Sequence, residues 1–234
     1  MRYFKINYAE SGRRFRSIDK YEPSEFNYRV LYHGVSFDNI NKLKIYYTSE
    51  VKYDDQTFNQ FGWFIVSDKV AKILRPFDGI QIFPKRAYSG NDLNKYYNVN
   101  IINITNVISA LDLEKSGYSV SGPDRIMNLY RIVFDPAKLT NKPDIFRLKE
   151  SLPDIFISER LKTLLELEKV TGFGFKLVAL SDDTFTENDT VLYKEYNRKT
   201  KEWEYNSYDT ITNIKQTLFS SPTEYRIHDF YRNK

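Results

Sequence analysis

Two stretches of sequence decide the fold: Trp63-Phe-Ile-Val-Ser-Asp-Lys-Val-Ala-Lys-Ile-Leu74 and Asp154-Ile-Phe-Ile-Ser-Glu-Arg-Leu-Lys-Thr-Leu-Leu165. Each reads as an apolar run, a serine, an acid, a base and a short amphipathic segment. A serine hydroxyl accepts hydrogen bonds from the free amides of a first helical turn, and a neighbouring acid suits the positive end of the helix dipole. We therefore predict a duplicated strand–helix–strand unit in which Ser67 and Ser158 cap the helices.

The residues that follow each serine predict how the unit packs and ends. Apolar residues at helical spacing form one face of each helix, and these are Val70, Ile73 and Leu74 in the first copy and Leu161, Leu164 and Leu165 in the second. Gly79 then leads into a strand over 80–83, which Pro84 is expected to stop. Gly172 is expected to close the second helix, before a strand over 173–180.

Outside the two copies, the pattern predicts strands with few helices. Alternation and β-branched or aromatic content indicate strands over 2–8, 28–32, 43–47, 99–107 and 130–134, and a hairpin over 191–196 and 203–208. Residues 9–27 are polar and charged and are expected to be a long loop or irregular segment, 52–59 are polar again, and 88–98 are expected to be a polar connector. The pattern favours an α+β fold with mixed or antiparallel sheets and a few short helices.

The expected organisation has three regions in one globule. An N-terminal lobe spans 1–90 with the first copy, a central region spans 91–180 with the second, and 181–234 holds the hairpin and a tail. The chain of 234 residues is long enough for this. Because it shows neither an apolar run of membrane length nor a secretory signal, we expect no membrane contact and a cytoplasmic location.

Composition excludes several kinds of chemistry. The chain has no cysteine, which removes thiolate nucleophiles, disulfides and cysteine-based metal sites. The net charge of +4 comes from interleaved acids and bases, so no basic stripe predicts nucleic-acid binding. His33 and His228 are the only histidines and lie in no recognisable motif. We therefore expect no catalytic, cofactor-binding or metal-ligating residues, although carboxylate pairs formed in the fold stay open.

One segment is the best candidate for contact with a partner. Asp182, Asp183, Glu187 and Asp189 make the densest acidic stretch, and Tyr193, Tyr196, Trp203 and Tyr205 are the aromatics of the predicted hairpin. The acidic stretch is a solvated loop, an ion site or a surface facing a basic protein. The aromatics form cross-strand pairs or remain exposed for a partner, and high tyrosine content by itself fits strand propensity.

The order of several short motifs resembles a known family. Phe64-Ile-Val-Ser-Asp-Lys69, Tyr97-Asn-Val-Asn-Ile-Ile-Asn-Ile104 and Ala110-Leu-Asp-Leu-Glu-Lys-Ser116 are similar to immunity protein family eleven of bacterial polymorphic toxin systems. Ile132-Val-Phe-Asp-Pro136, Ile145-Phe-Arg-Leu148, Ile155-Phe-Ile-Ser-Glu-Arg-Leu161 and Thr171-Gly-Phe173 extend the resemblance. Together these motifs cover roughly residues 30–180.

The resemblance implies a function and a partner. Members of the family are thought to bind and neutralise a cognate toxin without a catalytic site of their own. Asp112 and Ser116, which match family positions, read as a local cap or turn. Two other classes stay open from the residues alone: a carboxylate-dependent hydrolase or transferase, and a nucleic-acid or sugar-binding module with a tyrosine-rich sheet.

Overall fold

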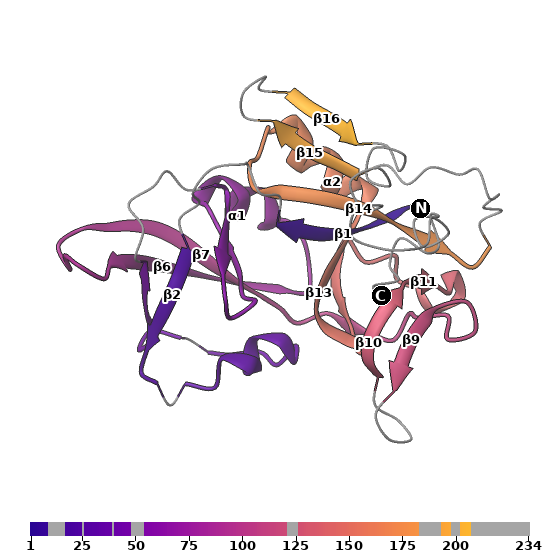
Figure 1. The fold of residues 1–234 in the computed structure, drawn as a ribbon, viewed down its shortest axis with the longest axis horizontal. Coiled ribbons are helices and arrows are strands. Elements are labelled where there is room, and N and C mark those ends of the chain that lie inside the picture. Colours follow the sequence, from indigo (N-terminus) through magenta and orange to yellow (C-terminus); the bar gives the residue numbers. More distant parts are fainter. Residues whose placement is uncertain are drawn as a thin grey trace, which may run out of the picture.

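A closed barrel and an eight-stranded sheet lie side by side in the structure (Figure 1). The computed structural model describes residues 1–8, 17–24, 26–38, 40–47, 54–120, 126–182, 193–197 and 202–206. The barrel runs through β2 (Ser17–Glu22), β3 (Lys44–Tyr47), β6 (Ile80–Ser89), β7 (Tyr96–Ile104), β5 (Phe64–Val66) and β4 (Gln56–Asn59). A barrel leaves no open edge among these strands, so their backbone groups are paired around the ring.

The large sheet gathers strands from both ends of the chain. Its order is β16 (Glu202–Asn206), β15 (Tyr193–Asn197), β14 (Phe173–Leu180), β1 (Tyr3–Tyr8), β13 (Ser151–Ser158), β12 (Ile145–Leu148) and β8 (Val107–Ile108). The eighth strand, β11 (Val133–Phe134), pairs with β14 off this path, and β9 (Gly117–Val120) pairs with β10 (Ile126–Arg131) in a separate two-stranded sheet. Both sheets are mixed, because β3–β6 and β8–β12 are parallel while most pairs are antiparallel.

Within the described residues, two α-helices complete the sheet-rich α+β architecture expected from the sequence. These are α1 (Asp68–Leu74) and α2 (Glu159–Leu167), with 3-10 turns η1 (Tyr28–Tyr32) and η2 (Pro136–Lys138). The serine caps are confirmed: the Val70 amide donates to Ser67 Oγ at 3.4 Å, and the Leu161 amide donates to Ser158 Oγ at 3.2 Å.

The two strand–helix–strand segments share one strand arrangement. Helix α1 joins β5 to β6, and both strands pair antiparallel with β7 between them. Helix α2 joins β13 to β14, and both pair antiparallel with β1 between them. Superposition of the two copies as equivalent units stays a prediction. Strand β1, from the expected N-terminal lobe, lies in the large sheet, and β7, from the expected central region, lies in the barrel.

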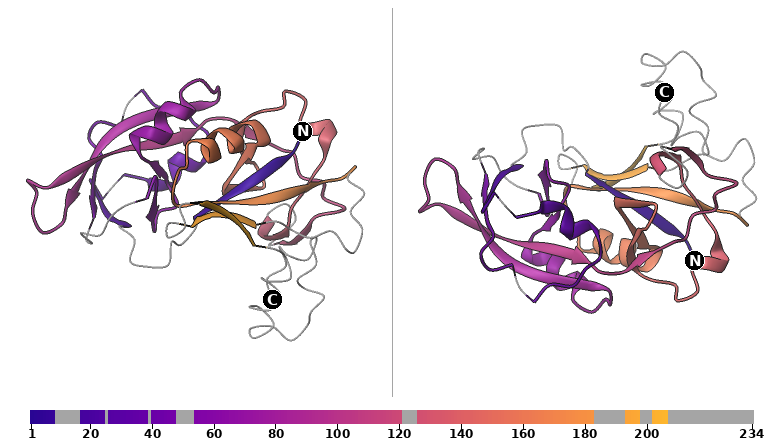
Figure 2. Two further views of the ribbon diagram at one scale, coloured as in Figure 1. Left: turned by 90° about the horizontal axis from the view of Figure 1, so that it is seen from above. Right: turned by 90° about the horizontal axis from the view of Figure 1, so that it is seen from below.

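The main core lies between the barrel and the large sheet. Helices α1 and α2 lie next to each other there (Figure 2). The shared core takes buried residues from both halves, including Phe4, Phe64, Val70, Ile102, Leu161 and Phe173. Two further cores fill the barrel and the far face of the sheet. Because one core serves both halves, we expect them to unfold together.

Several local predictions are wrong, and each has a physical reason. Residues 28–32 form a 3-10 turn instead of a strand, since the Asn27 side chain accepts the Arg29 amide at 3.1 Å and caps it. Strands β2 and β4 lie in polar stretches for which the sequence predicts no strand, because pairing within the barrel stabilises polar strands that show little alternation.

The β6–β7 hairpin and α2 also differ from expectation. Pro84 lies inside β6, where the register pairs it with Asn100 of β7, while pairing with β3 begins only at Ala87. A proline is tolerated where one side of a strand needs no donor. Leu164 is exposed. Lys169, with φ of 50°, closes α2 instead of Gly172, and its amide bonds the Glu166 carbonyl in a Schellman motif.

Candidate functional site

The segment predicted to contact a partner follows the last strand of the second copy. Asp182 is exposed two residues beyond the end of β14. Asp183, Glu187 and Asp189 lie outside the described residues. Tyr193 and Tyr196 belong to β15, and Trp203 and Tyr205 belong to β16, which confirms the predicted hairpin.

The hairpin register makes two of these residues direct cross-strand partners. Tyr196 is the direct partner of Trp203, whereas Tyr205 is opposite Lys194 and Tyr193 is opposite Asn206. The hairpin extends the large sheet through pairing of β15 with β14, and it lies at the top of the molecule in Figure 1. The structure therefore unites four of the eight predicted residues in one hairpin.

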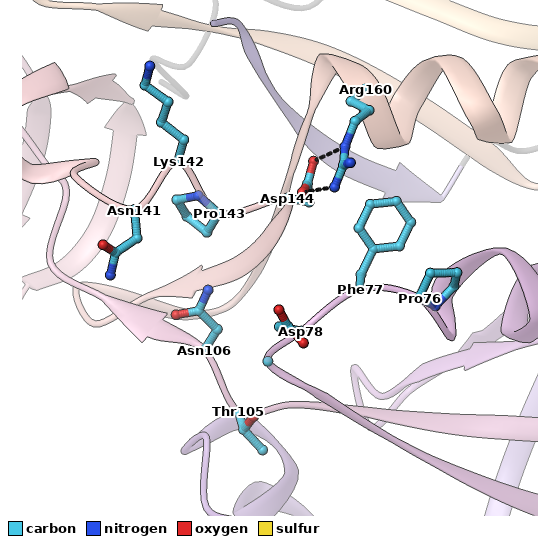
Figure 3. A pocket seen from close by; sticks show the side chains of 11 residues that line it. Pro76, Phe77, Asp78, Thr105, Asn106, Asn141, Lys142, Pro143, Asp144 and Arg160 are labelled. Atoms are coloured by element: carbon cyan, nitrogen blue, oxygen red, sulfur yellow. Dashed lines mark hydrogen bonds and ion pairs between the residues drawn. The ribbon is translucent and has the colours of Figure 1, made fainter.

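A polar pocket of about 440 Å³ lies where the two halves meet (Figure 3). The turn after α1 contributes Phe77 and Asp78, the end of β7 leads to Asn106, and the loop before β12 supplies Lys142 and Asp144. Arg160, from the first turn of α2, points into the same space. The pocket thus draws on four segments that are distant in sequence.

The charges inside this pocket are engaged with each other. Arg160 Nε donates to Asp144 Oδ1 at 3.0 Å, and its Nη2 donates to Oδ2. Ser158 Oγ also donates to Asp144 Oδ1. The hydrogen bond and the charge of Asp144 raise the pKa of Arg160, whose guanidinium lies 5.0 Å from the Phe77 ring centroid. A general base needs a lone pair aimed at a substrate proton, whereas this carboxylate holds the start of α2.

The first helix has an equivalent anchor. Asp55 Oδ1 accepts the Ser67 hydroxyl at 2.7 Å, and the Ser67 amide donates to the Asp55 carbonyl at 2.8 Å. Asp55 Oδ2 accepts the Thr171 amide at 2.9 Å, and the Asp55 amide donates to Thr171 Oγ1 at 3.1 Å. Asp55 therefore joins the α1 cap in the barrel to the segment that leads into β14.

Arg147 is the largest polar side chain in the interior. It is fully buried on β12, and its Nη1 donates to the carbonyls of Leu152 and Pro153 at 2.7 and 2.9 Å. Its guanidinium lies 5.5 Å from the Tyr32 ring centroid, at the end of η1. Burial lowers the pKa of Arg147 to about 10. This arginine ties the hairpin between β12 and β13 to the barrel.

Local sequence patterns do not predict these anchors. Asp55 and Asp144 precede their cap serines by 12 and 14 residues, a spacing that becomes meaningful only when the intervening strand is placed. Asp112 behaves as the local cap that was expected, since it accepts the amides of Glu114 and Lys115 at 3.0 Å each.

The described residues contain neither a metal-binding cluster nor a membrane-spanning helix. No group of three or more histidines and acids has the arrangement needed to hold a metal ion in that part of the chain. Within the same residues, no helix combines the length and the apolar character that crossing a membrane requires.

Comparison with known proteins identifies one family. The sequence model of the family described as "Immunity protein family (Imm11)" matches residues 12–179, which is well over half of the chain. It includes the barrel strands, both helices and both anchors described above. A comparison with curated proteins finds no match.

Proposed function

The chain belongs to the Imm11 immunity protein family, and from this premise we propose that it binds and neutralises a cognate toxin of a polymorphic toxin system. The family match over residues 12–179 is the observation that carries the proposal. It confirms the resemblance inferred from the order of short apolar motifs. Inhibition by binding requires a stable surface held by a rigid scaffold, and the barrel and sheet share one core.

We propose a mechanism of occlusion without catalysis. Membership of an immunity family implies such a role. The polar pocket supports it, because Asp144 already accepts hydrogen bonds from Ser158 and Arg160 on both oxygens. A protein that works by occlusion is consumed one for one with its toxin, and a cytoplasmic location is proposed with this role.

The surface chosen from sequence stays a proposal for toxin contact. Asp182, Asp183, Glu187 and Asp189 would offer carboxylates to a basic toxin, and Tyr193, Tyr196, Trp203 and Tyr205 would supply aromatic anchors. All eight residues lie beyond residue 179, where the family match ends.

Co-expression tests the proposed function. The product of the gene immediately upstream should arrest growth when expressed alone, and this chain should restore growth and co-purify with it. An arrested culture with no complex, under conditions where the chain is folded and present, would overturn the proposal. Expression of the chain with an unrelated toxin provides the control, because protection there would indicate a general stress response.

A further inference from the structure

A row of three tyrosines and a lysine crosses the outside of the barrel. The strand register pairs Lys20 of β2 with Tyr46 of β3, Tyr46 with Tyr88 of β6, and Tyr88 with Tyr96 of β7. Residues paired in register point to the same face of a sheet. The row therefore lies on one face, and its last two members are near the hairpin end that projects at the left of Figure 1.

The side chains of the row contact one another and their charged neighbours. The Tyr46 and Tyr88 ring centroids are 6.3 Å apart, and those of Tyr88 and Tyr96 are 6.0 Å apart. The Arg86 guanidinium lies 4.5 Å from the Tyr96 centroid, and the Lys20 ammonium lies 5.4 Å from that of Tyr46. Contacts at these distances hold the aromatic and cationic groups in place before any partner arrives.

The charge of this face is mainly positive. Glu22 accepts the Tyr46 hydroxyl at 2.8 Å and pairs with Lys20 at 2.9 Å. These two contacts lower the pKa of Glu22. Lys44 is the register partner of Glu22. The face thus has three cations, Lys20, Lys44 and Arg86, and one carboxylate, Glu22. Their sum is a net charge of two positive charges.

The outward tyrosines Tyr46, Tyr88 and Tyr96 are not part of the barrel core. The barrel interior already contains Tyr47 and Tyr97, which are buried with ring centroids 5.0 Å apart. On the outside, Tyr96 keeps 48% of its surface exposed. A hollow of about 360 Å³ lies next to the row and is lined in part by Pro84, Arg86 and Asn98. Its other two charged residues, Asp68 and Lys85, are of opposite sign, so they leave the net charge of the face unchanged. Exposed tyrosine and arginine beside a hollow are the usual anchors of a protein interface.

We infer that this face, defined by Lys20, Tyr46, Tyr88, Tyr96 and Arg86, docks an acidic surface of the cognate toxin. The inference rests on the proposed function and names the surface that performs it. The net positive charge favours a partner with carboxylates, which Arg86 can bind through its planar fork. Glu22, which contacts Lys20 and Tyr46 at one end of the row, disfavours a phosphate backbone at that place. The face also lies within the family match, unlike the eight residues chosen from sequence.

The test uses binding of the full chain to a catalytically inactive form of the toxin encoded upstream. The test variant carries Arg86→Glu and Tyr96→Ala, both at exposed positions. The expected result is a loss of about 30-fold or more in affinity, the size of a hot-spot effect, together with loss of growth protection. Association of the wild type should slow with added salt, and this dependence should weaken in Arg86→Glu alone.

Two controls keep the outcomes separate. Lys149→Glu makes the same charge change at an exposed turn between β12 and β13 and should bind as the wild type does. The pair Asp182→Asn and Trp203→Ala tests the competing surface. A folded test variant that keeps wild-type affinity, or loses no more than Lys149→Glu does, would overturn the docking proposal while the function stands.

Two further results would also overturn it. Failure of the wild type to bind the toxin would remove the proposed function and this surface with it. Saturable binding of a single-stranded oligonucleotide by the wild type, lost in the test variant without change in toxin affinity, would assign the tyrosine row to nucleic acid instead.

Discussion

Replacing Asp55 tests whether the barrel and the large sheet form one cooperative unit. Its carboxylate accepts the Ser67 hydroxyl at 2.7 Å and the Thr171 amide at 2.9 Å. Asp55→Ala removes both acceptors and leaves two donors on different halves without them. A hydrogen bond to a charged group contributes about 1.5–3 kcal/mol. Because Asp55 is partly exposed and water can replace part of the loss, we expect a total of about 3 kcal/mol.

Urea unfolding followed by circular dichroism measures this loss. We expect a single transition at a lower midpoint with an unchanged slope, as for a two-state protein that is less stable. Asp55→Asn, which keeps the shape and one acceptor, should lose about half as much. Asp78→Ala, at an exposed position of the polar pocket, is the control and should change stability by less than about 0.5 kcal/mol. A loss below about 1 kcal/mol for Asp55→Ala, or two separate transitions, would refute the role of this anchor.

Three other predictions concern stability. Gly172→Ala should cost about 3 kcal/mol or more by chemical denaturation, because φ is +80° and a Cβ would lie 2.6 Å from Asp54 Cβ; an effect under about 1 kcal/mol would contradict this. Arg147→Ala should cost about 3 kcal/mol or more, since it leaves a cavity and two unpaired carbonyls, while Arg147→Met, which fills the space, should cost less; equal losses would refute the packing part. Burial, with a smaller effect of Asp144, raises the pKa of Tyr3 from 10.0 to about 12. The unfolded chain therefore loses this proton first, and stability falls as pH rises between those values. Across that pH range, the free energy of unfolding should fall less in Tyr3→Phe than in the wild type. An identical pH dependence in the two proteins would contradict the raised pKa of Tyr3.

The start of each helix could be read from the sequence because the N-cap signal is local. Ser67 and Ser158 are caps in the structure as predicted, since a cap depends on a side chain and amides within one turn. The hairpin of β15 and β16 was also found, because its two strands are close in sequence. Such features need no knowledge of the tertiary fold.

Features set by distant pairing were missed. Strand β2 pairs with β3 and β4, but no local pattern in residues 17–22 predicts which strands will pair with it. Pro84 reads as a strand end in isolation, but in the barrel its position has a partner strand on one side only. Register decides both cases, and register follows from the whole barrel.

The tyrosine row shows the same limit at the functional surface. Tyr46, Tyr88 and Tyr96 become neighbours only through the pairing of β3, β6 and β7. Residues 88–98 were predicted to be a polar connector, so Tyr88 and Tyr96 were not assigned to the face of any sheet. Composition indicated many tyrosines, and the fold decides which of them meet.

Titration of toxin activity against the purified chain tests most directly whether the protein acts by stoichiometric binding. Occlusion predicts that residual toxin activity falls linearly and reaches zero at one chain per toxin, with a stable complex of the two at the end point. An enzyme that modifies the toxin would inactivate an excess of it at lower ratios, given time. Complete inactivation by substoichiometric chain would contradict occlusion by binding, and toxin activity unaffected at any ratio would contradict the proposed immunity function.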